Sequence, residues 1–313
     1  MRVLRAATGE VRALGFSPDG EALVAGYESR GLYAWELGSD APPLRLAPDA
    51  HLAQPQLFFS PDGRIVFWLS QTGRTAADRT TGRRVPAGPV PDQPLVWFGQ
   101  TPDASRVFRA SGPWRRRKLD TWRHGVAGAG GNDRGEWVRE WAEDTTDART
   151  ATLALDPSGE RLAHLADRPI PRAWPEFYRL VVRDAANGAE VGYGRYPYST
   201  ECRLLFRPDG RLVVGFHKMT LLVWPIPGGG APKLVRNDTQ KHLTAAAFHP
   251  SGRYLFTTSN DATAVVWNTL TWERVARFTW QVGPLKSVAV SPDGMLAAAG
   301  SDQGQVVVWD VDL

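Results

Sequence analysis

Arginine and aromatic side chains gather in three short segments of the sequence. The segments are SGPWRRRK (residues 111–118), DRPIPRAWPEFYR (167–179) and YGRYPYSTE (193–201). These residue types carry much of the energy in protein interfaces, because arginine pairs with carboxylates and rings bury a large area at small entropic cost. The candidate partner-binding residues are Trp114, Arg115, Arg116, Arg168, Arg172, Trp174, Tyr178, Arg195, Tyr196 and Tyr198. The alternative is that rings such as Trp174 fold back onto the stem of their own loop.

The usual catalytic and metal-binding patterns are missing from this sequence. Its six histidines show no H-E-x-x-H spacing, and no G-x-S-x-G motif occurs. Cys202 is the single cysteine and begins an apolar run, which favours a buried thiol. The GAGG run at residues 128–131 lacks the Gly-Lys-Ser/Thr of a phosphate loop. We therefore expect no catalytic residue, no metal and no cofactor.

Composition and charge narrow the class of protein further. Lys and Arg number 37 against 33 Asp and Glu, a net charge of +4. This small excess does not predict nucleic-acid binding, and the run Arg115 to Lys118 is better explained as alternating residues entering a strand. No apolar run reaches the length of a membrane span, and the first residues do not form a signal peptide. The expectation is a soluble, monomeric protein of the cytoplasm that binds no membrane.

A turn motif recurs along the whole chain. SPDG begins at Ser17, Ser60 and Ser291, and its variants are TPDA, DPSG, RPDG and HPSG, which begin at residues 101, 156, 207 and 249. Four of the six intervals between these starts are close to 42 residues, and two are about ten residues longer. Short β-rich runs separated by polar turns fill each interval, as in YLFTTS and AVVWNT. Four short strands in a period of about 40–45 residues are typical of one propeller blade.

The repeats resemble those of the WD-repeat family. The position of the family's Trp falls in the third run of each copy, at Trp35, Ala77, Leu119, Arg183, Trp224, Trp267 and Trp309. In the sixth copy, His242, Thr257, Asp261 and Trp267 match the family's structural hydrogen-bond tetrad. The resemblance covers residues 1–313 and implies one all-β domain, a seven-bladed β-propeller of four-stranded antiparallel blades.

The family's loop geometry implies that the three Arg-rich and aromatic segments share one face of the ring. It also implies a non-catalytic scaffold or adaptor that binds protein partners. One alternative is a propeller enzyme or sensor, such as a metal-dependent hydrolase, with a small ligand in the axial channel. Another is a propeller module of a larger signalling system. The enzyme would need converging carboxylates at the channel mouth.

The two ends of the sequence predict how the ring closes. The last repeat has three strands, ending with QVVVWDV (Gln305 to Val311). The opening MRVLR is similar to ERVAR in the last strand of the sixth copy. Residues 2–7 should therefore pair with this final run and supply the missing fourth strand, which removes two open sheet edges.

Overall fold

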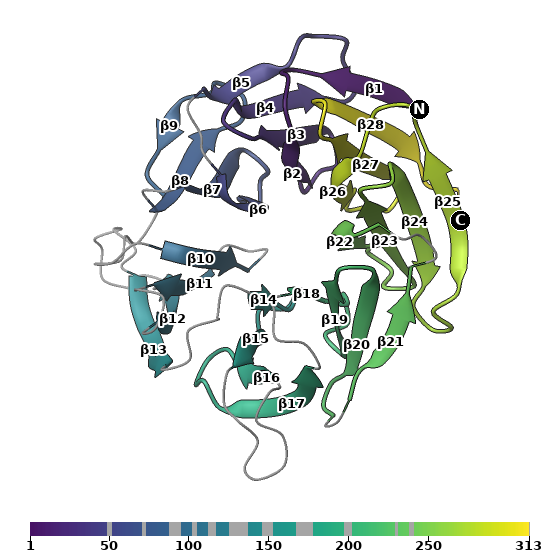
Figure 1. The fold of residues 1–313 in the computed structure, drawn as a ribbon. Coiled ribbons are helices and arrows are strands. Elements are labelled where there is room, and N and C mark those ends of the chain that lie inside the picture. The colour runs from purple at the N-terminus through teal and green to yellow at the C-terminus, as the bar shows by residue number, and fades with distance from the viewer. Residues whose placement is uncertain are drawn as a thin grey trace.

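Seven four-stranded antiparallel sheets stand around a common axis in the computed structural model (Figure 1). This confirms the seven-bladed β-propeller predicted from the repeats. The structure describes residues 1–48, 52–70, 73–87, 95–101, 105–111, 117–124, 137–145, 153–166, 178–196, 202–228, 231–237 and 241–312. All regular elements in these ranges are strands, so no helix there could cross a membrane.

Blades 1 to 4 follow one another along the chain, each ordered from the axis outward. Blade 1 is β2 (Val11–Phe16), β3 (Ala22–Tyr27), β4 (Gly31–Glu36) and β5 (Leu44–Ala47). Blade 2 is β6 (Leu52–Phe59), β7 (Ile65–Ser70), β8 (Gly73–Asp78) and β9 (Arg84–Val85). Blade 3 is β10 (Leu95–Gln100), β11 (Arg106–Ser111), β12 (Arg117–His124) and β13 (Trp137–Thr145). Blade 4 is β14 (Leu153–Leu155), β15 (Arg161–Ala166), β16 (Tyr178–Asp184) and β17 (Glu190–Tyr196).

Blades 5 to 7 complete the ring. Blade 5 is β18 (Arg203–Phe206), β19 (Leu212–His217), β20 (Thr220–Pro225) and β21 (Lys233–Arg236). Blade 6 is β22 (Leu243–Phe248), β23 (Tyr254–Ser259), β24 (Thr263–Asn268) and β25 (Arg274–Thr279). Blade 7 is β26 (Leu285–Val290), β27 (Leu296–Ser301), β28 (Gln305–Asp310) and, as its outer strand, β1 (Arg2–Arg5).

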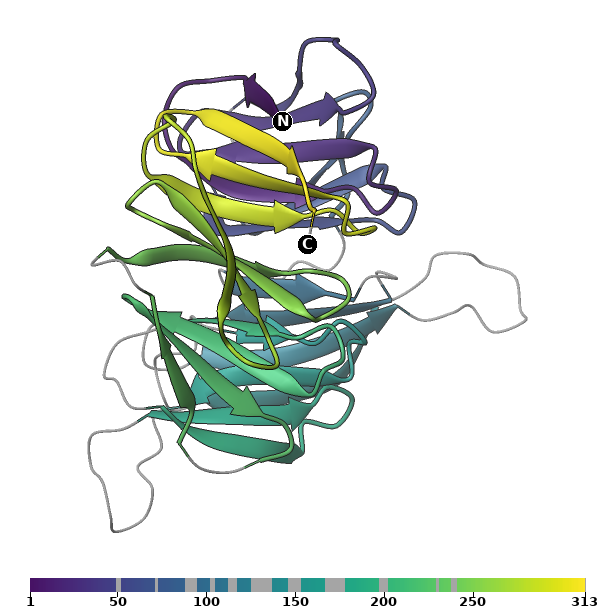
Figure 2. The same cartoon turned by 90° about the vertical axis from the view of Figure 1, so that its right-hand side faces the viewer.

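The N-terminal strand closes the ring as predicted. β1 pairs antiparallel with β28, with Arg2 opposite Val308 and Arg5 opposite Gln305. The strand ends at Arg5, two residues earlier than expected. Arg2 also donates to the carbonyl of Leu37 at 2.7 Å, which ties the closing strand to blade 1. The two termini accordingly lie near one another in both Figure 1 and Figure 2.

The repeated tetrapeptide forms the tight turn between the first and second strands of a blade. Gly20 takes a left-handed φ of 74°, which glycine adopts without steric cost. The hydroxyl of Ser17 accepts a hydrogen bond from the Ala22 N–H at 2.9 Å and donates to Asp19. That donation lowers the pKa of the Asp19 carboxyl below its ordinary value. Ser60 and Ser291 hold the equivalent turns in the same way.

One pair of residues occupies an equivalent position in every blade. We call it the seam pair. Its first member is the third-strand residue at the Trp position. Its second member is the second-strand residue that pairs with the residue two positions before that Trp position. From blade 1 to blade 7 the seam pairs are Trp35–Ala25, Ala77–Trp68, Trp122–Arg109, Arg183–His164, Trp224–Gly215, Trp267–Thr257 and Trp309–Ala299.

Strand register corrects one position of the repeat alignment. Trp122, and not Leu119, occupies the Trp position of blade 3, because it pairs with Val107, the second residue of its neighbouring strand. Leu23 and Trp35 pair in the same way in blade 1. The connection between β11 and β12 has five residues, against two or three in blades 1, 2, 5, 6 and 7. A fixed count from the turn therefore ends three residues before Trp122.

Apolar cores fill the seams of blades 5, 6, 7 and 1. Trp267, for example, packs with Leu212, Val214 and Leu221 of blade 5, and Trp309 packs with Phe256 of blade 6. Burial of this much apolar area is the dominant stabilising contribution in such a fold.

In blades 3 and 4, charged side chains occupy the seam pairs in place of apolar ones. Arg109 and Asp120 are both buried and form a bidentate ion pair of 2.8 and 2.9 Å, with the guanidinium 4.5 Å from the Trp122 ring centre. In blade 4, Arg183 Nε donates to His164 Nε2 at 3.1 Å. Burial, together with the charge of Arg183, lowers the pKa of His164 to about 3, so this imidazole is neutral and can accept.

Candidate functional site

The predicted partner-binding residues fall mostly outside the described residues. Those outside are Trp114, Arg115, Arg116, Arg168, Arg172, Trp174 and Tyr198. Tyr178 is the first residue of β16, and its backbone pairs with Tyr196. Their role in binding therefore stays a prediction.

Arg195 and Tyr196, at the end of β17, have opposite environments. The side chain of Arg195 is exposed, while its carbonyl accepts a 3.0 Å hydrogen bond from Trp224 Nε1. Tyr196 is completely buried, and its ring lies 6.3 Å from that of Trp224 in the core between blades 4 and 5. The expectation that Tyr196 contacts a partner is corrected here: alternation along the strand turns its ring inward.

Of the tetrad expected in blade 6, the structure shows the hydrogen bond between Trp267 and Thr257. Trp267 Nε1 donates to Thr257 Oγ1 at 2.9 Å in the buried core. Asp261 accepts from the backbone N–H of Thr263 and holds the β23–β24 turn. His242 is exposed, and its main-chain carbonyl accepts from Ser259 Oγ and from the Asn260 N–H. The tetrad residues therefore stabilise the blade, with His242 acting through its backbone.

Cationic side chains from three blades converge near one mouth of the axial channel. The innermost strands β2, β18 and β26 line the axis in Figure 1. Arg12 is the second residue of β2, Arg203 the first of β18 and Lys286 the second of β26. The starts of these strands lie on the face that carries the connections from one blade to the next. We call these three residues, with Glu10 and Glu28, the channel-mouth cluster.

The two glutamates engage two of the three cations. Arg12 Nη2 lies 2.6 Å from Glu28 and its Nε 3.5 Å from Glu10. Lys286 Nζ lies 3.8 Å from Glu10 and donates to Asn260 Oδ1 at 2.9 Å. Glu10 therefore bridges the cations of blades 1 and 7 across their seam. The cluster as a whole carries one more positive than negative charge.

Arg203 is the third cation and donates to a neutral acceptor, the carbonyl of Thr244, at 2.8 Å. Water reaches Arg203 through the channel, yet the surrounding wall partly desolvates its guanidinium and lowers its pKa. The negative charge of Glu10 opposes this shift and the positive charge of Arg12 adds to it, so all three groups are within electrostatic reach. A carboxylate brought by another molecule would find a guanidinium there that is already positioned.

The last quarter of the chain matches a known family of repeats. Residues 233–268 and 272–310 match the family model for the WD domain, G-beta repeat. Each match begins at the outer strand of one blade and ends at the third strand of the next, the same order in which β1 precedes β2 to β4. These two stretches carry the WD repeat, and the described part of the chain forms a seven-bladed β-propeller.

Segments of the chain are similar to segments of several longer proteins. It is 32% identical over 93 residues to pre-mRNA-processing factor 19 of Oryza sativa subsp. japonica, covering 29% of this chain and 18% of that protein. It is 36% identical over 67 residues to the guanine nucleotide-binding protein subunit beta of Dictyostelium discoideum, covering 21% and 19%. It is 33% identical over 72 residues to eukaryotic translation initiation factor 3 subunit I of Aspergillus terreus, covering 23% and 21%. The matched part spans about a fifth of each of these relatives.

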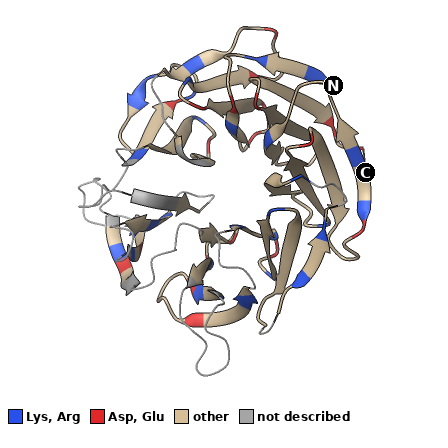
Figure 3. Ribbon diagram, in the orientation of Figure 1, with Lys and Arg blue, Asp and Glu red and all other residues tan. Residues whose placement is uncertain are grey.

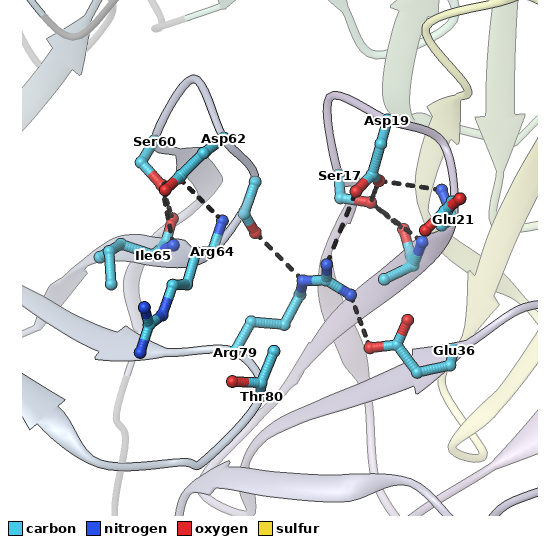
Figure 4. A network of polar contacts seen from close by, with 12 residues as sticks. Ser17, Asp19, Glu21, Glu36, Ser60, Asp62, Arg64, Ile65, Arg79 and Thr80 are labelled. Atoms are coloured by element: carbon cyan, nitrogen blue, oxygen red, sulfur yellow. Dashed lines mark hydrogen bonds and ion pairs between the residues drawn. The ribbon is translucent and has the colours of Figure 1, made fainter.

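A second polar network lies on the opposite face, where the tetrapeptide turns are. Arg79 of blade 2 is buried and donates to the Gly63 carbonyl at 3.0 Å. Its guanidinium also reaches Glu36 at 2.5 Å and Asp19 at 3.7 Å, both in blade 1 (Figure 4). Each nitrogen of the Arg79 guanidinium thus contacts an oxygen atom within this protein. The network therefore fastens two blades together and does not form a binding site.

The alternative of a metal-dependent enzyme finds no ligand set in the described part of the chain. No group of three or more His, Cys, Asp or Glu side chains there is arranged to hold a metal ion. A hollow of about 480 Å³ between blades 3 and 4 is lined by Arg106, Glu160, Arg161 and Asp184, among others. Its arginines are engaged by Glu140 and by the Gly210 carbonyl.

Sequence reasoning missed the channel-mouth cluster. Arg12, Arg203 and Lys286 come from blades 1, 5 and 7 and are far apart along the chain. One signal was present: each lies at or next to the start of a first strand, where the propeller geometry brings all blades toward the axis. Comparing that position across the repeats would have found them.

Proposed function

We propose that this protein is a non-catalytic interaction scaffold, and that it binds a protein partner on the face of the ring that carries the channel-mouth cluster. The WD repeats support this proposal, and two of the similar proteins are named as subunits of larger assemblies. Blade-to-blade connections and the loops between second and third strands share this face, and we propose that the Arg-rich and aromatic segments predicted from the sequence contribute to the same binding surface. Residence in the cytoplasm remains part of the proposal.

The observation that carries the proposal is the convergence of Arg12, Arg203 and Lys286 on the channel mouth. Arginine at the centre of a surface, supported by a rigid scaffold, is a frequent hot spot of protein interfaces. Strands β2, β18 and β26 already fix the backbone of these residues. Binding a partner therefore orders little additional structure and loses little conformational entropy. A partner with an acidic side chain at the centre of its contact surface fits this arrangement.

Affinity capture from the native cell, followed by mass spectrometry, tests the proposal. The test variant is Arg203→Ala with Lys286→Ala, and the matched control is Arg211→Ala with Arg253→Ala, two exposed arginines beside the turns of the opposite face. We expect the test variant to lose partners that the wild type and the control both retain, with all three proteins melting within a few degrees. Equal capture by the test variant and the control would contradict the site.

A further inference from the structure

The outer strands of five consecutive blades carry only positive charge. Strands β21, β25, β1, β5 and β9 form the rim of blades 5, 6, 7, 1 and 2, and blue segments mark them in Figure 3. We call their basic residues the rim belt, and all of them are exposed: Arg2, Arg5, Arg45, Arg84, Lys233, Arg236, Arg274 and Arg277. These five strands contain no Asp or Glu.

Protection of the open strand edges does not explain this uniform sign. Charged side chains, and lysine above all, discourage an edge from pairing with another chain, whereas seven of the eight residues of the rim belt are arginine. The sequence contains nearly as many acidic residues as basic ones, 33 against 37. The outer strand of blade 3, β13, includes Glu140, Glu143 and Asp144, and that of blade 4 includes Glu190. The belt therefore has a charge pattern that edge protection alone does not require.

Much of this positive charge is not neutralised within the protein. Lys233 donates to the carbonyl of Thr271 and Arg45 to that of Pro48, and neutral acceptors of this kind leave the charge in place. Arg2 pairs with Asp40 at 3.1 Å, on a side chain that water surrounds completely, and Arg277 lies 4.0 Å from Asp261. Ion pairs so exposed or so long are weak and exchange readily with an incoming carboxylate.

Apolar side chains lie between the cations along the same strands. Val3 is 49% exposed, Leu234 51% and Val275 46%. Each lies beside an arginine or lysine of the belt, and each strand also presents the backbone N–H and C=O groups of a sheet edge. The rim thus offers positive charge, apolar surface and backbone hydrogen bonds together.

We propose that the rim belt binds an acidic, extended segment of a partner protein, which adds to the edge of blade 6 as a fifth strand along β25. β25 is the longest strand of the belt, with six residues, and carries Arg274, Val275 and Arg277 on its exposed sides. A peptide in which acidic and apolar residues alternate satisfies all three features of the rim. A nucleic acid satisfies only the charge.

Fluorescence anisotropy with a labelled peptide of alternating Glu and Val tests this inference. The test variant is Arg274→Glu with Arg277→Glu, and the control Arg211→Glu with Arg253→Glu makes the same change in net charge elsewhere. We expect the wild type and the control to bind the peptide, and the test variant to bind at least about tenfold more weakly. Backbone N-methylation of the peptide should abolish binding, and hydrogen exchange should slow in β25 amides when the unmodified peptide binds.

Three results would overturn the inference: equal peptide affinity in the test variant and the control, undiminished binding of the N-methylated peptide, or binding of an oligothymidine probe with no binding of the peptide. The rim belt shares no residue with the channel-mouth cluster. A protein that keeps its captured partners but does not bind the peptide would therefore reject this inference alone, and the reverse result would reject the proposed function alone.

Discussion

Blades 3 and 6 fill the same position with different chemistry. In blade 6 the seam pair is a neutral hydrogen bond of 2.9 Å from Trp267 to Thr257. In blade 3 the equivalent Trp122 lies against Arg109, whose charge is balanced by a bidentate bond to Asp120. Trp267 and Thr257 are buried in blade 6, as are Arg109 and Asp120 in blade 3. The seam pair therefore requires side chains that fill the space and charges that are paired. It does not require one particular residue.

Two other blades support the same conclusion by geometry. In blade 2 the large and small residues are exchanged, with Trp68 on the second strand and Ala77 on the third. In blade 5, a Cβ on Gly215 would lie 3.0 Å from Cys202 Sγ and 3.1 Å from the Trp224 ring. Glycine thus leaves the space in which Trp224 turns to donate to the Arg195 carbonyl of blade 4.

Removing the carboxylate of blade 3 should have the largest effect on this comparison. Asp120→Asn leaves the Arg109 guanidinium buried without a counter-charge, which should lower the free energy of unfolding by about 3–5 kcal/mol. Replacing both partners, with Arg109→Met and Asp120→Leu, should cost far less or even stabilise the fold. Urea denaturation of the three proteins measures this. A double variant as unstable as Asp120→Asn would mean that the ion pair itself is needed.

Acid should weaken blade 4 through His164. The folded pKa of about 3 lies below the ordinary value of 6.5, so the unfolded chain binds a proton that the folded protein excludes. Stability from this group is therefore complete above pH 6.5 and declines as the pH falls toward 3. Unfolding at pH 5 should cost about 2 kcal/mol less than at pH 7.5. His164→Gln should flatten this part of the stability profile, and an unchanged slope would contradict the assignment.

The smallest expected change in stability concerns the seam pairs of blades 6 and 7. Trp309 Nε1 is buried with no hydrogen-bond partner among the described residues, because Ala299 stands where blade 6 has Thr257. Ala299→Ser should supply an acceptor and stabilise the protein by about 1 kcal/mol. Thr257→Val, the matched change in blade 6, should cost about 1–2 kcal/mol. Thermal melts of both variants measure this, and a loss of stability in Ala299→Ser would show that blade 7 has no room for the hydroxyl.

Much of the fold could be predicted because its signals are local. The tetrapeptide turns depend on residues within a few positions of one another, and they located all seven blades. The Trp position followed from spacing alone, and for that reason it failed in blade 3, where a longer connection moved Trp122 beyond the expected distance. The exchange of Trp68 and Ala77 was invisible, because it depends on which residues face each other across two strands.

The candidate site was harder to predict for the same physical reason. Tyr196 and Arg195 are neighbours in the sequence, yet one is buried and the other exposed, and only the strand register decides which. The channel-mouth cluster and the rim belt combine residues from several blades. Their proximity is set by the closure of the ring and not by any local pattern.

Because β1 pairs with β28, the ring cannot close until β28 has been synthesised. The two strands are separated by about 300 residues, so at ribosomal rates of roughly 5–20 residues per second β1 waits about 15–60 s for its partner. During that time Val3 and the neighbouring edge are open to solvent and to other nascent chains. Arg2 and Arg5 then oppose aggregation of this strand before it pairs with β28.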